Sequence, residues 1–209
     1  MQKITIDRKA LKAVSLFAAK KDIRYYLCGV LVESTPLETR LIGCDGHTLG
    51  VHRSEAKGDN VGVFSGIIPL DAVTAILKWK SPVRNDDIPV TLTAQDNGEI
   101  RADYCGQSII FKCVDGKFPD YRRVIPSQLN GEKAFFNPDY LIRLRDAAKA
   151  LNVAFAFGYN GDSAALATIG ESMIAVVMPL RTEYLDSAIG ASWAREALPG
   201  CDNVVSLAA

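Results

Sequence analysis

Residues 3–18 read KITIDRKALKAVSLFA, a strand pattern followed at once by a helix pattern. The first four residues contain a short β-branched run that is bounded by Asp7, which predicts a strand. Asp7 itself stands where a helix N-cap is preferred. At about 100° per residue, one face of the following helix carries apolar side chains, namely Ala10, Leu11, Val14, Phe17 and Ala18. The stretch predicts a strand that leads directly into a helix able to cover a sheet.

The same order of elements occurs three times along the chain. In the first unit, runs rich in β-branched and aromatic residues predict three further strands, over residues 25–33, 39–46 and 48–53. The second unit has a strand over 63–68, a helix opened by Pro69, and strands over 89–94, 99–104 and 108–113. The third has a strand over 134–136, a helix opened by Asn137-Pro138, and strands over 153–158, 164–169 and 173–179.

This repetition predicts an α+β fold in which three β-α-β-β-β units place their helices on one face of antiparallel sheets. We expect a first domain over residues 1–126 that contains two units, and a single third unit over residues 127–181. Residues 182–209 form a C-terminal extension that we expect to be helical. Its apolar residues follow at i, i+4 spacing before Pro199-Gly200; they are Leu185, Ile189 and Trp193.

Composition indicates a compact protein without net charge. The 209 residues include 24 acidic and 24 basic side chains, and 48% of the residues are hydrophobic. This balance excludes an overall basic footprint of the kind that coats nucleic acid. The sequence has no apolar run long enough to span a membrane and no signal-peptide pattern. Five cysteines without CxxC spacing are typical of reduced thiols, so we expect a cytoplasmic protein.

The outer faces of the three predicted helices are basic on balance, although the chain is neutral. Two interpretations stay open. Lysines on the solvent side of a helix are usually only a solvated face. If the three faces converge, however, they create the local positive field that phosphate contact requires. The candidates for phosphate contact are Arg8, Lys9, Lys12, Lys20, Lys78, Arg143, Arg145 and Lys149.

The sequence contains no pattern of catalytic or metal-ligating residues. Its two histidines are His47 and His52, and Asp45-Gly46-His47 is not accompanied by a second ligand cluster at a suitable spacing. Asp45-Gly46 is typical of a hairpin turn rather than of a thiol–imidazole site with Cys44. Walker A, GxGxxG and GxSxG motifs are absent from the sequence. We expect a binding protein that is not an enzyme and uses neither metal nor cofactor.

Four segments in order carry a specific resemblance. RYYLCGVL (24–31) is followed by CDGHTL (44–49), VDGKFPDYRRVIP (114–126) and VVMPLR (176–181). In this order they resemble the RYYL-x-G, DGH, DG-x-FPDYRRV-x-P and VVMP-x-R signatures of the bacterial DNA polymerase III β sliding clamps. The resemblance covers nearly all of residues 1–181 and implies a DNA-clamp fold.

The resemblance also implies how the units correspond to a clamp subunit. Units one and two are similar to the middle of three clamp domains, and unit three is similar to the second half of the last domain. Clamp rings contain about twelve such units, so three units per chain predict a ring of four chains. The resemblance leaves the first clamp domain and the first half of the last domain without a counterpart in the chain. The C-terminal extension either packs on its own subunit, or it replaces part of that absent half-domain or seals a subunit contact.

The function implied by the resemblance is that of a processivity factor in DNA replication. Such a protein forms a homo-oligomeric ring whose helices face duplex DNA without reading its sequence. A DNA polymerase and the clamp loader attach to it through a short apolar peptide. The alternative is a peptide-binding module that forms no ring and acts as a regulator or decoy of a full clamp's partners.

The family's peptide-binding cleft can be carried over residue by residue. Alone, Val176, Val177 and Met178 are better explained as a buried strand, but all parts of one cleft occur together in the chain, which favours a functional site. An apolar groove with a few polar groups is the expected design for a peptide anchor. Thr48 stands where the family usually has an arginine and Cys44 where it often has a threonine, which affects the choice of partner. The predicted cleft residues are Tyr26, Leu27, Gly46, His47, Leu49, Pro119, Arg123, Val124, Asn137, Tyr140, Val176, Val177, Met178, Pro179 and Arg181.

Overall fold

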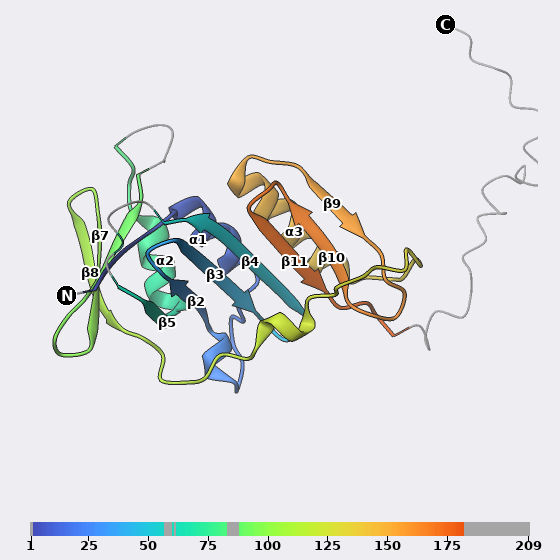
Figure 1. The fold of residues 1–209 in the computed structure, drawn as a ribbon, viewed down its shortest axis with the longest axis horizontal. Helices are drawn as coiled ribbons and strands as arrows, with labels where there is room; N and C mark the ends of the chain where they lie inside the picture. The colour runs from blue at the N-terminus through green and yellow to red at the C-terminus, as the bar shows by residue number, and fades with distance from the viewer. Residues whose placement is uncertain (1, 57–59, 61, 83–87, 182–209) are drawn as a thin grey trace, which may run out of the picture.

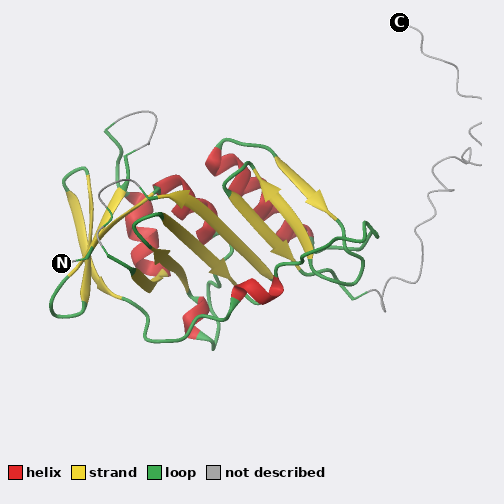
Figure 2. Ribbon diagram, viewed as in Figure 1, coloured by secondary structure: helices red, strands yellow, loops and turns green. Residues whose placement is uncertain are grey.

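The computed structural model describes residues 2–56, 60, 62–82 and 88–181, and its strands form two antiparallel sheets (Figures 1 and 2). The four-stranded sheet has the order β1-β6-β7-β8, with bounds Lys3–Ile6, Val90–Ala94, Glu99–Tyr104 and Gln107–Lys112. The seven-stranded sheet has the order β5-β2-β3-β4-β11-β10-β9. Its strands are Phe64–Pro69, Gly29–Ser34, Glu38–Cys44, Thr48–Glu55, Met173–Val177, Ala165–Ile169 and Phe155–Gly158.

Three helices, α1 (Arg8–Ser15), α2 (Leu70–Lys78) and α3 (Pro138–Leu151), cover one face of the seven-stranded sheet (Figure 1). The side chain of Asp7 accepts hydrogen bonds from the backbone of Lys9 and Ala10, and so caps α1 as predicted. The side chain of Asn137 caps α3. Within the described part of the chain, no helix is long and apolar enough to cross a membrane.

The first two units exchange their first strands. Strand β1 of the first unit pairs with β6 of the second, and β5 of the second unit pairs with β2 of the first. The third unit joins this body through the pairing of β11 with β4. As a result one continuous sheet runs from β5 to β9, and α1 packs against both α2 and α3.

Strand alternation gives this sheet an apolar cluster on each face. On the helix side, fully buried side chains such as Leu11, Val30, Ile76 and Leu144 form the main core. On the outer side a second cluster gathers around Leu27, Leu49, Phe118, Tyr121 and Val176. The fold therefore buries apolar side chains on both faces of its central strands.

Three details differ from the sequence prediction. Residues 134–136 form no strand: in the other units the first strand joins a partner unit's sheet, and the third unit has no such partner among the described residues. Residues 25–27 form a 3₁₀ helix, η1 (Tyr25–Leu27), ahead of β2. Helix α1 ends at Ser15, so Phe17, Ala18 and Lys20 follow it. The predicted helical extension, 182–209, lies outside the described residues.

The buried His52 makes the stability of this fold dependent on pH. Its side chain on β4 is 6% exposed, and its Nδ1 atom has no hydrogen-bond partner among the described residues. Burial lowers the pKa of His52, and the negative charge of Asp7 offsets only part of this effect. Between that lowered pKa and the ordinary histidine value, the unfolded chain binds more protons than the folded one. The free energy of unfolding therefore falls as the pH drops below about 6.5.

We predict that the urea midpoint of unfolding decreases between about pH 7 and about pH 5.5, and that His52→Gln removes most of this decrease because glutamine does not titrate. His47→Gln is the matched control at an exposed position, and it should keep the dependence. An unchanged pH dependence in His52→Gln would show that another group is responsible.

Candidate functional site

The boundary between the first and third units carries an apolar ladder on the outer face of the sheet. Strands β4 and β11 are antiparallel there, with Leu49 opposite Val176 and Val51 opposite Ile174. Met178 extends the pairing, since its backbone N–H donates to the carbonyl of His47 at 3.0 Å. We call these four outer-face residues the seam: Leu49, Val51, Ile174 and Val176.

A segment of residues 113–126 crosses the same outer face and is anchored next to the seam. Phe118 and Tyr121 are buried in the outer cluster, Tyr121 on the 3₁₀ helix η2 (Tyr121–Val124). The Tyr121 hydroxyl donates to Glu33 on β2 at 2.9 Å, and Arg122 forms an ion pair with the same carboxylate at 2.8 Å. Burial is the main reason why the pKa of Tyr121 is raised, so its hydroxyl stays a donor to Glu33.

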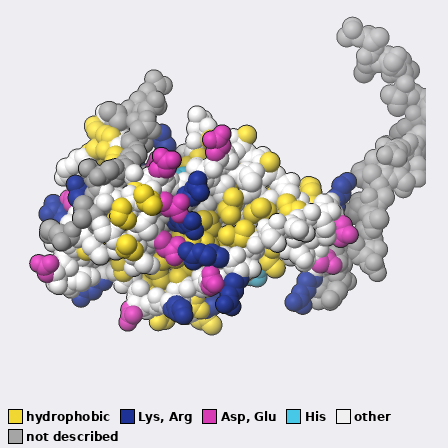
Figure 3. Space-filling model, in the orientation of Figure 1, with side chains coloured by type: hydrophobic (Ala, Val, Ile, Leu, Met, Phe, Trp, Pro, Cys, Tyr) yellow, Lys and Arg dark blue, Asp and Glu magenta, His cyan; other side chains and the backbone are white. Residues whose placement is uncertain are grey.

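A hollow of about 380 Å³ lies between this segment and the seam. Val51, Ile174, Tyr121 and Ile125 supply its apolar lining, and its polar border includes Arg40, Arg53 and Arg122. Figure 3 shows hydrophobic side chains over the middle of this face, bordered by Lys and Arg side chains with Asp and Glu among them. We call this hollow, together with the seam, the seam groove.

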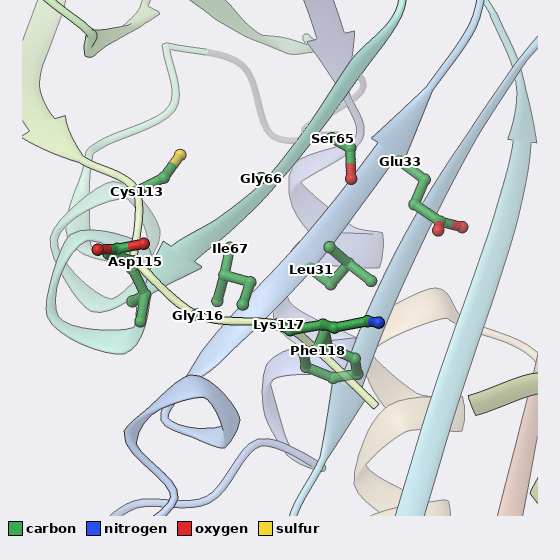
Figure 4. Close-up of a pocket in the computed structure, with 11 residues that line it drawn as sticks. Leu31, Glu33, Ser65, Gly66, Ile67, Cys113, Asp115, Gly116, Lys117 and Phe118 are labelled. Atoms are coloured by element: carbon green, nitrogen blue, oxygen red, sulfur yellow. The ribbon is translucent and has the colours of Figure 1, made fainter. Parts of the chain in front are cut away.

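A second hollow, of about 370 Å³, lies on the other side of the segment (Figure 4). Leu31, Ile67 and Phe118 lie along it, while Glu33 and Asp115 bring carboxylates to its edge. Its lining is less apolar than that of the seam groove and includes Ser65 and Lys117. An apolar peptide is therefore better matched by the seam groove.

The end of the seam is fixed by an ion pair between the two units. Asp45, in the β3–β4 turn, accepts hydrogen bonds from the backbone of His47 at 2.9 Å and of Thr48 at 2.7 Å. Arg143 of α3 donates to the Asp45 carboxylate and to the Thr48 hydroxyl. Burial alone would raise the pKa of Asp45, but the hydrogen bonds from Arg143, His47 and Thr48 outweigh it and lower the pKa.

Aromatic side chains continue this contact at the surface. The ring of His47 stacks on that of Tyr140 from α3, with 6.0 Å between centroids, and the Arg143 guanidinium lies over the same tyrosine at 5.3 Å. His47 and the nearby Met178 are exposed. An exposed apolar and aromatic rim thus stands at the end of the seam groove.

The predicted cleft residues fall into distinct layers. Leu27, Leu49 and Val176 form a buried floor, while Tyr26, Tyr140 and Pro179 are half-buried. Exposed positions are Gly46, His47, Pro119, Arg123, Val124, Met178 and Arg181. Val177 was wrongly placed in the cleft, because alternation turns it away from Val176 into the helix-side core. Asn137 is half-buried and caps α3 with its side chain, and its place in the cleft stays a prediction.

The sequence prediction contained none of the ten residues that line the hollow of the seam groove. It therefore missed the four side chains that supply the apolar lining: Val51, Ile174, Tyr121 and Ile125. A signal for two of them was present in the sequence. Val51 follows Leu49 by two positions on β4, and Ile174 precedes Val176 by two positions on β11. Strand alternation therefore puts all four side chains on one face of the sheet. The contribution of Tyr121 and Ile125 depends on where residues 113–126 cross the sheet, which local patterns do not predict.

The basic residues of the helix face are fewer than the sequence predicted. Arg8 donates to the carbonyls of Ile76, Leu77 and Trp79 at the end of α2, Lys20 lies beyond α1, and Arg143 pairs with Asp45. Arg8 and Arg143 are thus held in contacts within the chain, whereas DNA contact by the exposed Lys20 stays a prediction. Lys9 and Lys12 line a hollow of about 280 Å³ that α2 and α3 also border. Lys12, Lys78, Arg145 and Lys149 are exposed.

The comparison with protein families decides where the chain belongs. The model of the DNA polymerase III beta subunit, central domain, matches residues 4–120, which is more than half of the chain. The chain belongs to this family. The match covers the first unit and almost all of the second, and so includes β4 and most of the residues around Asp45 and Tyr26.

Relatives of this family share both sequence and fold with the chain. The Escherichia coli K12 beta sliding clamp is 34% identical over 119 residues, which cover 57% of this chain and 31% of that protein. The structure of the Pseudomonas aeruginosa DNA polymerase III beta subunit matches with a TM-score of 0.68 at 22% identity, over 87% of this chain and 67% of that one. The Helicobacter pylori beta clamp, solved with a DNA ligase peptide, matches with a TM-score of 0.70 at 15% identity, over 86% and 65%.

These likenesses show the clamp fold for most of the described chain. The matched segment, however, spans about a third of the length of the curated relatives. At the position where the resemblance leads us to expect an arginine, Thr48 is buried and its hydroxyl accepts from Arg143 at 2.8 Å. The guanidinium beside Asp45 therefore comes from α3 of the third unit.

We predict that Arg143 and Asp45 are energetically coupled by about 1–2 kcal/mol, because both are half-buried and share hydrogen bonds. The coupling is measured by urea unfolding of Arg143→Gln, Asp45→Asn, the double variant and the native protein. The exposed pair Arg145 and Asp146 is the matched control, with an expected coupling below about 0.5 kcal/mol. Equal couplings for both pairs would contradict a specific role of Arg143 at the unit boundary.

Proposed function

We propose that the protein is a sliding-clamp-like processivity factor, which encircles duplex DNA as a homo-oligomeric ring and holds a DNA polymerase through a short apolar peptide. The observation that carries this proposal is the seam groove. It lies on the outer face of the sheet, opposite the face that the helices cover. One face can thus bind a partner protein while the other faces DNA.

The lining of the groove suits a short peptide with large apolar residues. Its apolar side chains come from three segments of the chain, and the rim offers Met178 at 41% exposure and the stacked His47. Burial of such residues would supply affinity, and the rim arginines would orient polar groups of the peptide. The Helicobacter pylori relative is bound to a DNA ligase peptide and a Pseudomonas aeruginosa relative to griselimycin, which supports the same use here.

The helix face suits contact with phosphates without sequence recognition. Lys12, Lys78 and Lys149 come from three different helices that cover the same face of the sheet. Lysines at such positions attract phosphates as point charges and read no base edges, which is what sliding requires. Three units per chain favour four chains for a complete ring.

The second candidate is a peptide-binding regulator that never closes a ring. It is favoured by the use of Arg8 and Arg143 in contacts within the chain, which leaves a weaker positive field on the helix face. Retention on nicked circular DNA together with release by linearisation separates the two. A ring gives both results, and the regulator gives neither.

We predict that Met178→Asp weakens binding of the DNA ligase peptide about tenfold or more, since it places a charge on the apolar rim. Fluorescence anisotropy with the labelled peptide, and competition by griselimycin, measure the effect. Ile110→Asp is the matched control, because Ile110 is 58% exposed on β8, away from the seam. Equal weakening by both variants would place the peptide elsewhere.

We predict that Lys12→Glu combined with Lys149→Glu weakens binding to duplex DNA and reduces the slope of log K against log salt by about 2 per chain, as expected for two lost phosphate contacts. Lys117→Glu, on the outer face, should change neither quantity. Peptide binding should be unaffected by all three changes. A salt slope that stays constant in the double variant would remove the helix face from the proposal.

A further inference from the structure

The first two units show how a pair of units is closed in this fold. Each donates its first strand to the other: β1 pairs with β6, with Ile6 opposite Val90, and β5 pairs with β2, with Ile68 opposite Val30. Every donated strand leads directly into a helix, and α1 and α2 pack together. The exchange covers the edge strand and the core of both units at once.

The third unit has both parts of such an exchange, but neither is paired with another unit among the described residues. The carbonyl of Phe135 instead accepts a hydrogen bond from the backbone N–H of Leu180 at 2.8 Å, which an exchange would have to release. Residues 133–136, KAFF, precede the capped helix α3 as residues 3–6, KITI, precede α1, but they belong to no strand. Phe136 rests against Phe157 of β9 at 5.0 Å between ring centroids. Strand β9 ends the seven-stranded sheet, and within the described residues it pairs with β10 alone (Figure 1).

Equivalent positions in the first and third units show which side chains are exposed at the β9 end of the sheet, which we call the open end. Val30 and Val32, on the helix side of β2, are fully buried under β5 and α2, whereas Phe155, on the helix side of β9, is 40% exposed. Leu11, the fourth residue after the N-cap of α1, is fully buried, whereas Leu141, the fourth after the N-cap of α3, is 38% exposed. The open end is therefore an unpaired strand edge beside exposed apolar side chains.

We propose that this open end binds the same surface of a second copy of the chain, by reciprocal exchange of residues 133–136. Each copy adds this segment antiparallel to β9 of the other, with α3 packed on α3 as α1 packs on α2. A second copy is the occupant because donor segment and acceptor edge lie on one surface, which makes that surface self-complementary about a twofold axis. The pairing of β1 with β6 gives the register: Phe136 opposite Phe155, and Ala134 opposite Phe157.

The β9 contact would be one of the subunit contacts of the proposed ring, and its role in the protein rests on that proposed function. A dimer joined through its third units would contain six units, with a β8 edge at each end of the arrangement. Two such dimers meeting at their β8 edges would supply the twelve units of a closed ring. The β9 contact can nevertheless form in a protein that never encircles DNA.

The first test compares lysine substitutions at the two open sheet edges. Ala156→Lys places a charge on β9, and Ile110→Lys is the matched change on β8; both positions are exposed. Light scattering over a range of concentrations should show that the native protein forms a dimer or a larger oligomer. Ala156→Lys should raise the dimer dissociation constant about tenfold or more, and Ile110→Lys should not. Thermal unfolding of both variants confirms that the chains remain folded.

The second test is a disulfide between two different chains. In a background of Cys105→Ser and Cys201→Ser, one chain carries Phe135→Cys and the other Ala156→Cys; the predicted register places these positions opposite each other on the outer face. Mixing and oxidation with glutathione disulfide should give a cross-linked heterodimer. Each variant alone should give little cross-linking.

Three results would overturn the inference. A monomer at all concentrations would overturn it. A dimer that is dissociated by Ile110→Lys but not by Ala156→Lys would also overturn it. So would a full chain that is monomeric but dimerises when residues 182–209 are removed, since that segment would then occupy the open end. A dimer with the expected cross-link that is not retained on circular DNA supports the β9 contact and contradicts the ring, so the two proposals fail separately.

Discussion

The structure depends on the antiparallel pairing of β4 with β11. This pairing joins the third unit to the first, places α3 beside α1 and makes one sheet of seven strands. It also creates the seam, since neither Leu49 nor Val176 has its outer-face neighbour without it. Arg143 and Asp45 secure one end by bridging a helix of one unit and a turn of the other. Without this boundary, the groove would have neither its floor nor its rim.

Charge serves two purposes in this neutral chain. Arg8 donates to the last carbonyls of α2, where a cation is favourable at a helix C-terminus. Arg143 lowers the pKa of a carboxylate that also holds a turn. Lys12, Lys78 and Lys149 of the three helices remain exposed, and Lys12 lines a hollow between the helices together with the half-buried Lys9. The electrostatics of the helix face therefore depend on a few lysines, and a count of basic residues overstates its strength.

The sequence predicts the units and the helix caps well, because strand patterns and caps are local. It does not predict which strands pair across units: residues 133–136 resemble residues 3–6, yet in the part of the chain that the structure describes they pair with no sheet edge of another unit. For the site, the four family segments contain Leu49 and Val176 of the seam but neither Val51 nor Ile174. Strand alternation would have added those two and excluded Val177. Arg143 was misassigned because its partner, Asp45, is distant in the sequence and close only in the fold.

Native-state hydrogen exchange across the seam tests the central claim most directly. The N–H groups of Arg53 and Met178 donate across the boundary, at its two ends, to Ser172 and His47. If units one and three form one cooperative body, these amides and those of β11 exchange with the same opening free energy as the amides of β2 and β3. If β9–β11 and α3 instead open together at clearly lower free energy while β2–β4 stay protected, the third unit is only loosely attached. The seam groove would then not be preformed, contrary to this account.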